Sequence, residues 1–113
     1  MPVSDSYIQY VKDQLQGVGQ ITTRKMFGGV GIYSGGLFFA LIADNTLYFK
    51  VDSTNIEDFE EFGMKPFKPY KNKKQTMNYY EVPADILENC NELAIWAHKA
   101  IAVAASARAR DTD

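Results

Sequence analysis

The stretch from Ile21 to Val51, ITTRKMFGGVGIYSGGLFFALIADNTLYFKV, decides the fold of this chain. Runs of strand-forming residues alternate in it with glycine pairs and an Asp-Asn pair, which are residues that tight turns require. Loops this short join antiparallel neighbours, because a parallel neighbour needs a crossover of about a dozen residues. We therefore predict a meander of antiparallel strands at Ile21–Phe27, Val30–Tyr33, Leu37–Ala43 and Leu47–Val51.

The third of these strands is apolar on both faces, which predicts a central strand or one with a face against a helix or a second subunit. The glycines between the strands do not form a phosphate loop, because no Gly-Lys-Ser/Thr follows them and no helix begins after them. They read instead as hairpin turns. Gly31 lies inside a short strand, where glycine marks a bulge or a close backbone contact.

Helical patterns flank the meander. Ser4 or Asp5 caps a first helix over residues 5–16, which Gly17 ends. Thr54 and Glu57 fit a capping box for a short helix that ends at Gly63. The residues expected to face inward from these two helices are Tyr7, Ile8, Val11, Leu15, Ile56, Phe59 and Phe62.

The second half of the chain returns to the sheet and closes with a helix. Two prolines make residues 64–70 an edge strand or an irregular arm, residues 71–75 a polar turn and residues 76–82 a strand. Pro83 opens a helical turn over residues 84–88, and Asn89 caps the last helix. The apolar stripe of that helix is Leu93, Trp96, Ala97, Ala100 and Ala104.

These elements predict an α+β fold in a single domain spanning residues 1–113. The order is an N-terminal helix, an antiparallel meander, a short helix, a two-stranded return and a C-terminal helix. Helices over one sheet face would bury a single core. The core is expected over about residues 5–106, with a tail at residues 107–113 that frays.

Composition excludes several classes of protein. The net charge of −2 supplies no basic field to gather nucleic acid, and one cysteine allows no disulfide within the chain. The longest apolar run is too short for a membrane helix, and the first residues lack the pattern of a secretory signal. We therefore expect a cytoplasmic protein without membrane association.

Candidate chemistry is sparse. Cys90 and His98 are the single cysteine and histidine, and both fall on the last helix, about 12 Å apart along its axis. That separation excludes a catalytic pair. The acidic run Glu57, Asp58, Glu60 and Glu61 reads as a solvated helix face rather than a cation site. We predict neither enzymatic activity nor a cofactor or metal.

Two features suggest a binding surface. A lysine run interleaved with Phe67 and Tyr70 could hold a phosphate backbone and stack bases, although lysines also guard exposed sheet edges. Arg24 and Lys25 extend this patch if the two regions lie together. Strand tyrosines are typical of protein interfaces and equally of the rim of a small core. The candidate interaction surface is Arg24, Lys25, Tyr33, Tyr48, Lys65, Phe67, Lys68, Tyr70, Lys71, Lys73, Lys74, Tyr79 and Tyr80.

Several linked motifs resemble the N-terminal domain of the TfoX/Sxy family of competence regulators. They are RKMFGGVG at residues 24–31, FALIAD at 39–44, LYFKV at 47–51, GMKPF at 63–67, YYEVP at 79–83 and Trp96-Ala97. The resemblance implies an α+β domain, bacterial regulatory work and no catalytic residues. Full-length members act with the cyclic-AMP receptor protein and carry a second, helical domain. A chain ending at Asp113 is expected to be a single-domain relative that lacks it.

Three functional hypotheses follow. The first is a non-enzymatic regulatory domain that binds a protein, such as a transcription factor or a second copy of itself. The second is a nucleic-acid-binding module that uses the segment from Lys65 to Lys74. The third is an enzyme or a small-ligand carrier, for which a pocket in the structure would be the first sign.

Overall fold

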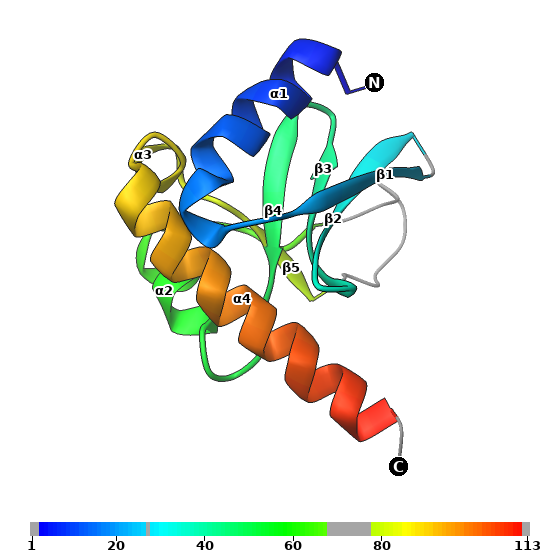
Figure 1. The fold of residues 1–113 in the computed structure, drawn as a ribbon. Coiled ribbons are helices and arrows are strands. Elements are labelled where there is room, and N and C mark those ends of the chain that lie inside the picture. Colours follow the sequence, from blue (N-terminus) through cyan, green and yellow to red (C-terminus); the bar gives the residue numbers. More distant parts are fainter. Residues whose placement is uncertain (1–2, 27, 68–77, 112–113) are drawn as a thin grey trace.

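The computed structural model describes residues 3–26, 28–67 and 78–111. The fold is α+β, as the sequence predicts, and its helices pack on an antiparallel sheet (Figure 1). The helices are α1 (Asp5–Gln14), the 3-10 helix η1 (Leu15–Val18), α2 (Ile56–Glu61), α3 (Ala84–Leu87) and α4 (Cys90–Asp111). The strands are β1 (Thr22–Met26), β2 (Gly29–Ser34), β3 (Leu37–Ala43), β4 (Thr46–Lys50) and β5 (Tyr79–Glu81).

The sheet has the strand order β1-β2-β3-β4-β5, so the predicted meander is confirmed and β3 is its central strand. Every neighbouring pair is antiparallel. The turn between β3 and β4 consists of Asp44 and Asn45, whose φ angles are 53° and 52°. Two successive left-handed residues produce the turn that best matches the twist of a two-residue hairpin.

A bulge in β3 turns two consecutive side chains, Phe39 and Ala40, toward the core. Ile32 pairs with Ala40, but the next residue of β2, Tyr33, pairs with Phe38, so Phe39 is the extra residue. A bulge lets two consecutive side chains lean toward the same side of a sheet. Phe39 is fully buried, and its ring centroid lies 5.9 Å from that of Phe49 in the core.

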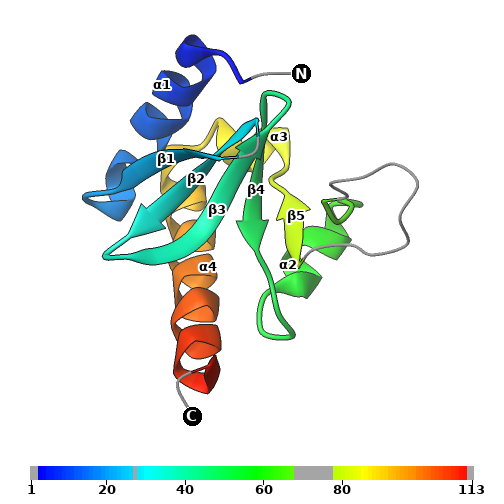
Figure 2. The same cartoon turned by 90° about the vertical axis from the view of Figure 1, so that its right-hand side faces the viewer.

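One face of the sheet carries the helices. The long helix α4 crosses behind the strands, and α1 lies on the same side near the turn that joins β3 to β4 (Figure 2). Three alanines of α4, Ala97, Ala100 and Ala104, are buried, and their small side chains let the helix approach the sheet closely. Within the described ranges, no helix is long and apolar enough to cross a membrane.

The corner between β4 and α2 depends on a buried amide. Asn55 is 2% exposed; its Oδ1 accepts from the Asp52 N–H at 2.8 Å, and its Nδ2 donates to the Lys50 carbonyl at 3.0 Å. The predicted capping box of Thr54 and Glu57 is wrong. Thr54 instead donates its amide to the carboxylate of Asp52 at 2.8 Å, and α2 begins one residue later.

Several predicted boundaries and orientations are corrected. Gly17 does not end the first helix, because the chain continues as η1 to Val18 and turns at Gly19, with a φ of 97°. Phe62 was expected to face inward but is 47% exposed, since it follows α2 and lies over the edge of the Trp96 ring.

The last helix is longer than predicted. It continues beyond Ser106 through Asp111, although a frayed tail was expected from residue 107. Residues 107–110 are alanines and arginines, both strong helix formers, and no glycine or proline interrupts them. The predicted cap is confirmed, because Asn89 Oδ1 accepts from the Glu92 N–H at 3.1 Å.

The predicted arm and return strand are described in part. Pro66 bridges to Tyr80, the Phe67 N–H donates to the Tyr79 carbonyl at 2.7 Å, and the Glu81 N–H donates to the Lys65 carbonyl at 3.3 Å. Residues 65–67 therefore run beside β5 as an irregular edge strand, as predicted. The polar turn expected at residues 71–75 lies outside the described residues.

Candidate functional site: the open sheet face

The face of the sheet opposite α4 carries a row of residues that crosses all five strands. In the antiparallel register, Arg24 pairs with Gly31, Gly31 with Leu41, Leu41 with Tyr48, and Tyr48 with Glu81. Directly opposite residues of an antiparallel pair point to the same side of the sheet. The row therefore lies on one face, which we call the open face. Of the described helices, α1, α2 and α4 lie on the other side (Figure 2).

Aromatic rings cover much of the open face. The ring centroid of Phe38 lies 5.1 Å from that of Tyr33 and 5.6 Å from that of Tyr79. A second pair, Tyr48 and Phe67, has its centroids 4.8 Å apart. Tyr33, Phe38, Tyr48 and Phe67 are all partly exposed. The open face thus presents flat, apolar surface with hydroxyl groups at its margins, a combination enriched at protein interfaces.

Gly31 makes room for these rings. A Cβ atom at this position would lie 2.7 Å from Met26 Cε, 3.1 Å from Phe38 Cε1 and 3.2 Å from Tyr33 Cε1. The sequence pattern offered a bulge or a close contact at Gly31, and the structure shows the close contact. Because glycine has no side chain, the neighbouring residues can close over the strand and form a continuous surface.

Burial holds two hydroxyl groups of the open face, those of Tyr48 and Tyr79, in the neutral form. Burial raises the pKa of Tyr79 to about 12, and the nearby Tyr33 adds to this effect. Burial also raises the pKa of Tyr48, with further contributions from the carboxylates of Glu81 and Asp44. The Lys50 Nζ lies 5.6 Å from the centre of the Tyr79 ring, in cation–π range. Neutral tyrosines can donate hydrogen bonds to a partner at any physiological pH.

The tyrosines and basic residues of the candidate interaction surface do not all lie on the same face of the sheet. Arg24, Tyr33 and Tyr48 lie on the open face, as a shared binding surface requires. Tyr79 lies on the same face but is only 4% exposed, so it supports the surface from beneath. Tyr80 points to the other side, where its ring centroid lies 6.1 Å from that of Phe59 of α2.

The described members of the proposed basic patch lie far apart. Lys65 is exposed on the segment that runs beside β5, whereas Arg24 is on β1 at the opposite edge, five strand spacings or about 24 Å away. Lys25 points to the helix side of β1. The remaining members of the predicted patch, Lys68, Tyr70, Lys71, Lys73 and Lys74, lie outside the described residues.

The sequence interpretation missed Phe38, the central ring of the open face. The signal was present: consecutive side chains of a strand alternate between faces, so the pair Phe38-Phe39 must place one ring away from the core. Lys50 was also missed. It faces away from Phe49 on the alternating fourth strand, and this position predicts the exposed side of the sheet.

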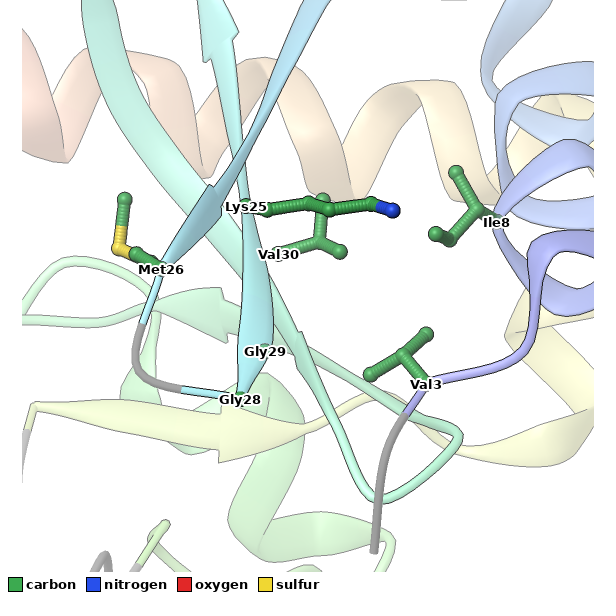
Figure 3. Close-up of a pocket in the computed structure, with 7 residues that line it drawn as sticks. All are labelled: Val3, Ile8, Lys25, Met26, Gly28, Gly29 and Val30. Carbon is green, nitrogen blue, oxygen red and sulfur yellow. The ribbon is translucent and has the colours of Figure 1, made fainter.

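Lys25 lines a shallow groove of about 390 Å³ between the start of α1 and the hairpin of β1 and β2. Figure 3 shows its side chain extending toward Ile8, while Met26 extends to the other side of the strand. Val3, Gly28, Gly29 and Val30 complete the lining. A second groove of about 360 Å³ lies near Ile56, Pro66 and Tyr80. Neither groove carries a cluster of titratable side chains.

The residues considered for catalysis or metal binding are dispersed. Cys90 and His98 are both exposed on α4. Asp58 pairs with Lys99 at 2.8 Å, which ties the acidic face of α2 to α4. In the part of the chain that the structure describes, no three histidine, cysteine or acidic side chains come together as metal ligands.

Fold and site together define a small α+β domain whose sheet has one helix-covered face and one open, aromatic face. The model of the TfoX N-terminal domain family matches residues 13–104, and the chain belongs to this family. It is also 32% identical over 81 residues to a DNA transformation protein, TfoX1, of Aliivibrio fischeri (strain ATCC 700601 / ES114). The aligned part is 71% of this chain and 37% of that relative. The family resemblance of the sequence motifs is thereby confirmed.

Proposed function

We propose that this chain is a non-enzymatic regulatory domain that binds a protein partner through its open face. The observation that carries the proposal is the cluster of partly exposed rings, Tyr33, Phe38, Tyr48 and Phe67, on a sheet face that none of the described helices covers. Large aromatic side chains supply contact area at a low cost in conformational entropy and dominate many interfaces.

The family relationship supports a regulatory role. The relative in Aliivibrio fischeri is named a DNA transformation protein, which is consistent with control of the genes for natural competence. We propose that this domain contributes by contacting another protein, such as a transcription factor, in the cytoplasm of a bacterium. A second copy of the chain is the other protein partner that an apolar face of this kind accepts.

The test is affinity capture from a lysate of the source cells, with quantitative mass spectrometry. The chain is compared with a Tyr33→Ser, Tyr48→Ser double variant and with a Tyr10→Ser control. Tyr10 is 38% exposed on α1, away from the open face. Partners should be retained by the unchanged chain and by the control, and depleted about tenfold or more on the double variant, since central tyrosines contribute about 2 kcal/mol each.

Two measurements complete this test. Circular dichroism must show that the double variant is folded, and light scattering must show whether the chain is monomeric. A monomer that retains no protein, or a double variant that retains the same proteins as the control, contradicts the proposal.

Nucleic-acid binding through the segment from Lys65 to Lys74 is the second candidate. The observation in its favour is the exposed Lys65 close to the paired rings of Phe67 and Tyr48. Fluorescence anisotropy with DNA and RNA at two salt concentrations tests it, because binding to phosphates must weaken steeply with salt. Replacement of Lys71, Lys73 and Lys74 by serine should abolish the signal, and unchanged binding would exclude this segment.

A further inference from the structure

The two edges of the sheet differ in how they end. At β5, the backbone of residues 65–67 forms hydrogen bonds with Tyr79 and Glu81 and covers part of that edge. At β1, residues 22–26 form no backbone hydrogen bond with any described residue outside β2. Alternate residues of an edge strand turn their N–H and C=O groups outward, so β1 offers a row of donors and acceptors that no described residue occupies.

β1 lacks most of the features that block the addition of another strand. It contains no proline and no bulge, and its pairing with β2 is regular along its whole length. Thr22, Arg24 and Lys25 are exposed, and Thr23 and Met26 are partly exposed. In Figure 2, β1 is the outermost strand on the side away from β5. The protective feature that β1 does have is positive charge, from the adjacent residues Arg24 and Lys25.

This charge is local to one side of an acidic molecule. The sequence from Gln14 to Ala43, which includes β1, β2 and β3, contains no aspartate or glutamate, although the net charge of the chain is −2. Arg24 points to the open face and Lys25 to the helix side. A strand added beside β1 would therefore meet one positive charge on each of its own faces.

Self-pairing of β1 is disfavoured by the same charges. In an antiparallel pair of two copies centred on this strand, Arg24 would stand opposite Arg24 of the other copy. Like charges directly opposite each other destabilise a sheet, whereas opposite charges stabilise it. The charges on this edge thus disfavour pairing with a second copy of the chain and favour pairing with an acidic segment. Repulsion of the wrong partner and attraction of the right one both contribute to specificity.

We propose that β1 binds an extended segment of the partner protein that carries two consecutive acidic residues, adding a sixth strand to the sheet. Consecutive residues of a strand point to opposite faces, so one acidic side chain pairs with Arg24 and the next with Lys25. The inference rests on the proposed function only in that the partner is a protein. It adds the location and the chemical class of the recognised segment.

The probe is a blocked peptide of strand length with alternating threonine and valine and two adjacent glutamates at its centre. The control has glutamines in place of the glutamates. Titration of the isotope-labelled chain, followed by NMR, should shift the amide signals of residues 22–26 and slow their hydrogen exchange. The glutamate peptide should bind about fivefold or more tightly than the glutamine peptide, given two opposite-charge pairs.

Two variants sharpen the result. An Arg24→Glu, Lys25→Glu double variant should lose the preference for the glutamate peptide and favour one with lysines instead. A peptide N-methylated at alternate positions keeps its charges but lacks the N–H groups that would donate hydrogen bonds to β1. This peptide should not bind. Amide shifts confined to other strands, equal binding of the glutamate and glutamine peptides, or binding that survives N-methylation would overturn the inference.

The outcomes separate the inference from the proposed function. If the peptide leaves β1 unchanged while capture of partners still depends on Tyr33 and Tyr48, the partner binds the open face without adding a strand. If the peptide binds β1 but the tyrosine variant retains every partner, the strand edge is the interface and the open face is not. A dimer formed through β1 in light scattering would identify a second copy as the occupant and refute the inference.

Discussion

Gly29 and Gly31 lie two residues apart on β2 and differ in what occupies the space where a side chain would be. At Gly29, a Cβ atom would lie 2.6 Å from the carbonyl oxygen of Ile42, which belongs to the backbone of the central strand. At Gly31, the nearest atom is the terminal methyl group of Met26, at 2.7 Å. A methionine side chain has several rotatable bonds and can move aside, whereas the backbone of β3 cannot.

We therefore expect Gly29→Ala to lower the free energy of unfolding by about 1–3 kcal/mol, as overpacking does, and Gly31→Ala to lower it by less. Urea unfolding followed by circular dichroism measures both. The second variant should also disturb Phe38 and Tyr33, because their rings lie within 3.2 Å of the new methyl group. An equal or smaller loss for Gly29→Ala would show that β3 yields more easily than its central position suggests.

Tyr79 gives the stability a dependence on alkaline pH. Its pKa is about 12 in the folded chain, against 10.0 for an ordinary tyrosine. Below pH 10 the hydroxyl is protonated in both states. Between pH 10 and 12 the unfolded chain loses this proton while the folded chain keeps it, so stability falls by up to about 1.4 kcal/mol per pH unit. Urea unfolding at pH 9 and 11 should show a larger loss for the unchanged chain than for Tyr79→Phe. Identical losses would mean that Tyr79 ionises normally.

Among the elements, α4 has the narrowest steric tolerance. Its buried side consists largely of alanines where it crosses β3, and Ala100 is fully buried. Ala100→Leu should lower the free energy of unfolding by about 1–3 kcal/mol, because the helix must move away from the sheet or strain its neighbours. Ala102 is exposed on the same helix. Ala102→Leu is the matched control, and a change within about 0.5 kcal/mol is expected there. Similar losses in thermal or urea unfolding for both variants would contradict close packing of α4.

The type of an element could be predicted from the sequence where local residue chemistry decides it. The boundary of an element could be predicted where a single residue fixes it. Asp44 and Asn45 tolerate left-handed backbone, so the turn between β3 and β4 followed from the sequence. The start of α2 did not, because Asn55 is committed to the buried corner and leaves the helix without a side-chain cap. Its side-chain partners, the amide of Asp52 and the carbonyl of Lys50, are groups that become adjacent only when the chain bends. The propensity of residues 107–111 for helix was visible, but nothing in the pattern marked where α4 stops.

For the molecule as a whole, strand-forming runs and turn residues predicted the meander and its central strand, and the linked motifs carried the family resemblance. The composition of the open face was only partly predictable. Periodicity assigns a side chain to one face or the other, but the pairing of distant strands decides which rings meet. Tyr33 and Tyr79 are far apart in sequence and share Phe38 as a neighbour only because β5 folds back beside β4. Likewise, the separation of Arg24 from Lys65 depends on the order of the strands in the sheet. The positions of charged residues along the sequence do not give that order.

Because Trp96 is the single tryptophan and lies in the core, tryptophan emission and tyrosine absorbance report on different parts of the molecule. This residue is 7% exposed on α4, with the rings of Phe59 and Phe62 edge-on at 4.7 and 5.6 Å, on the side of the sheet away from the open face. Its emission therefore reports the integrity of the core and should shift to longer wavelength when the chain unfolds. A partner seated on the open face leaves that emission unchanged and alters the tyrosine absorbance instead. Unfolding can therefore be followed by tryptophan emission and partner binding by tyrosine absorbance, in the same sample and without a label.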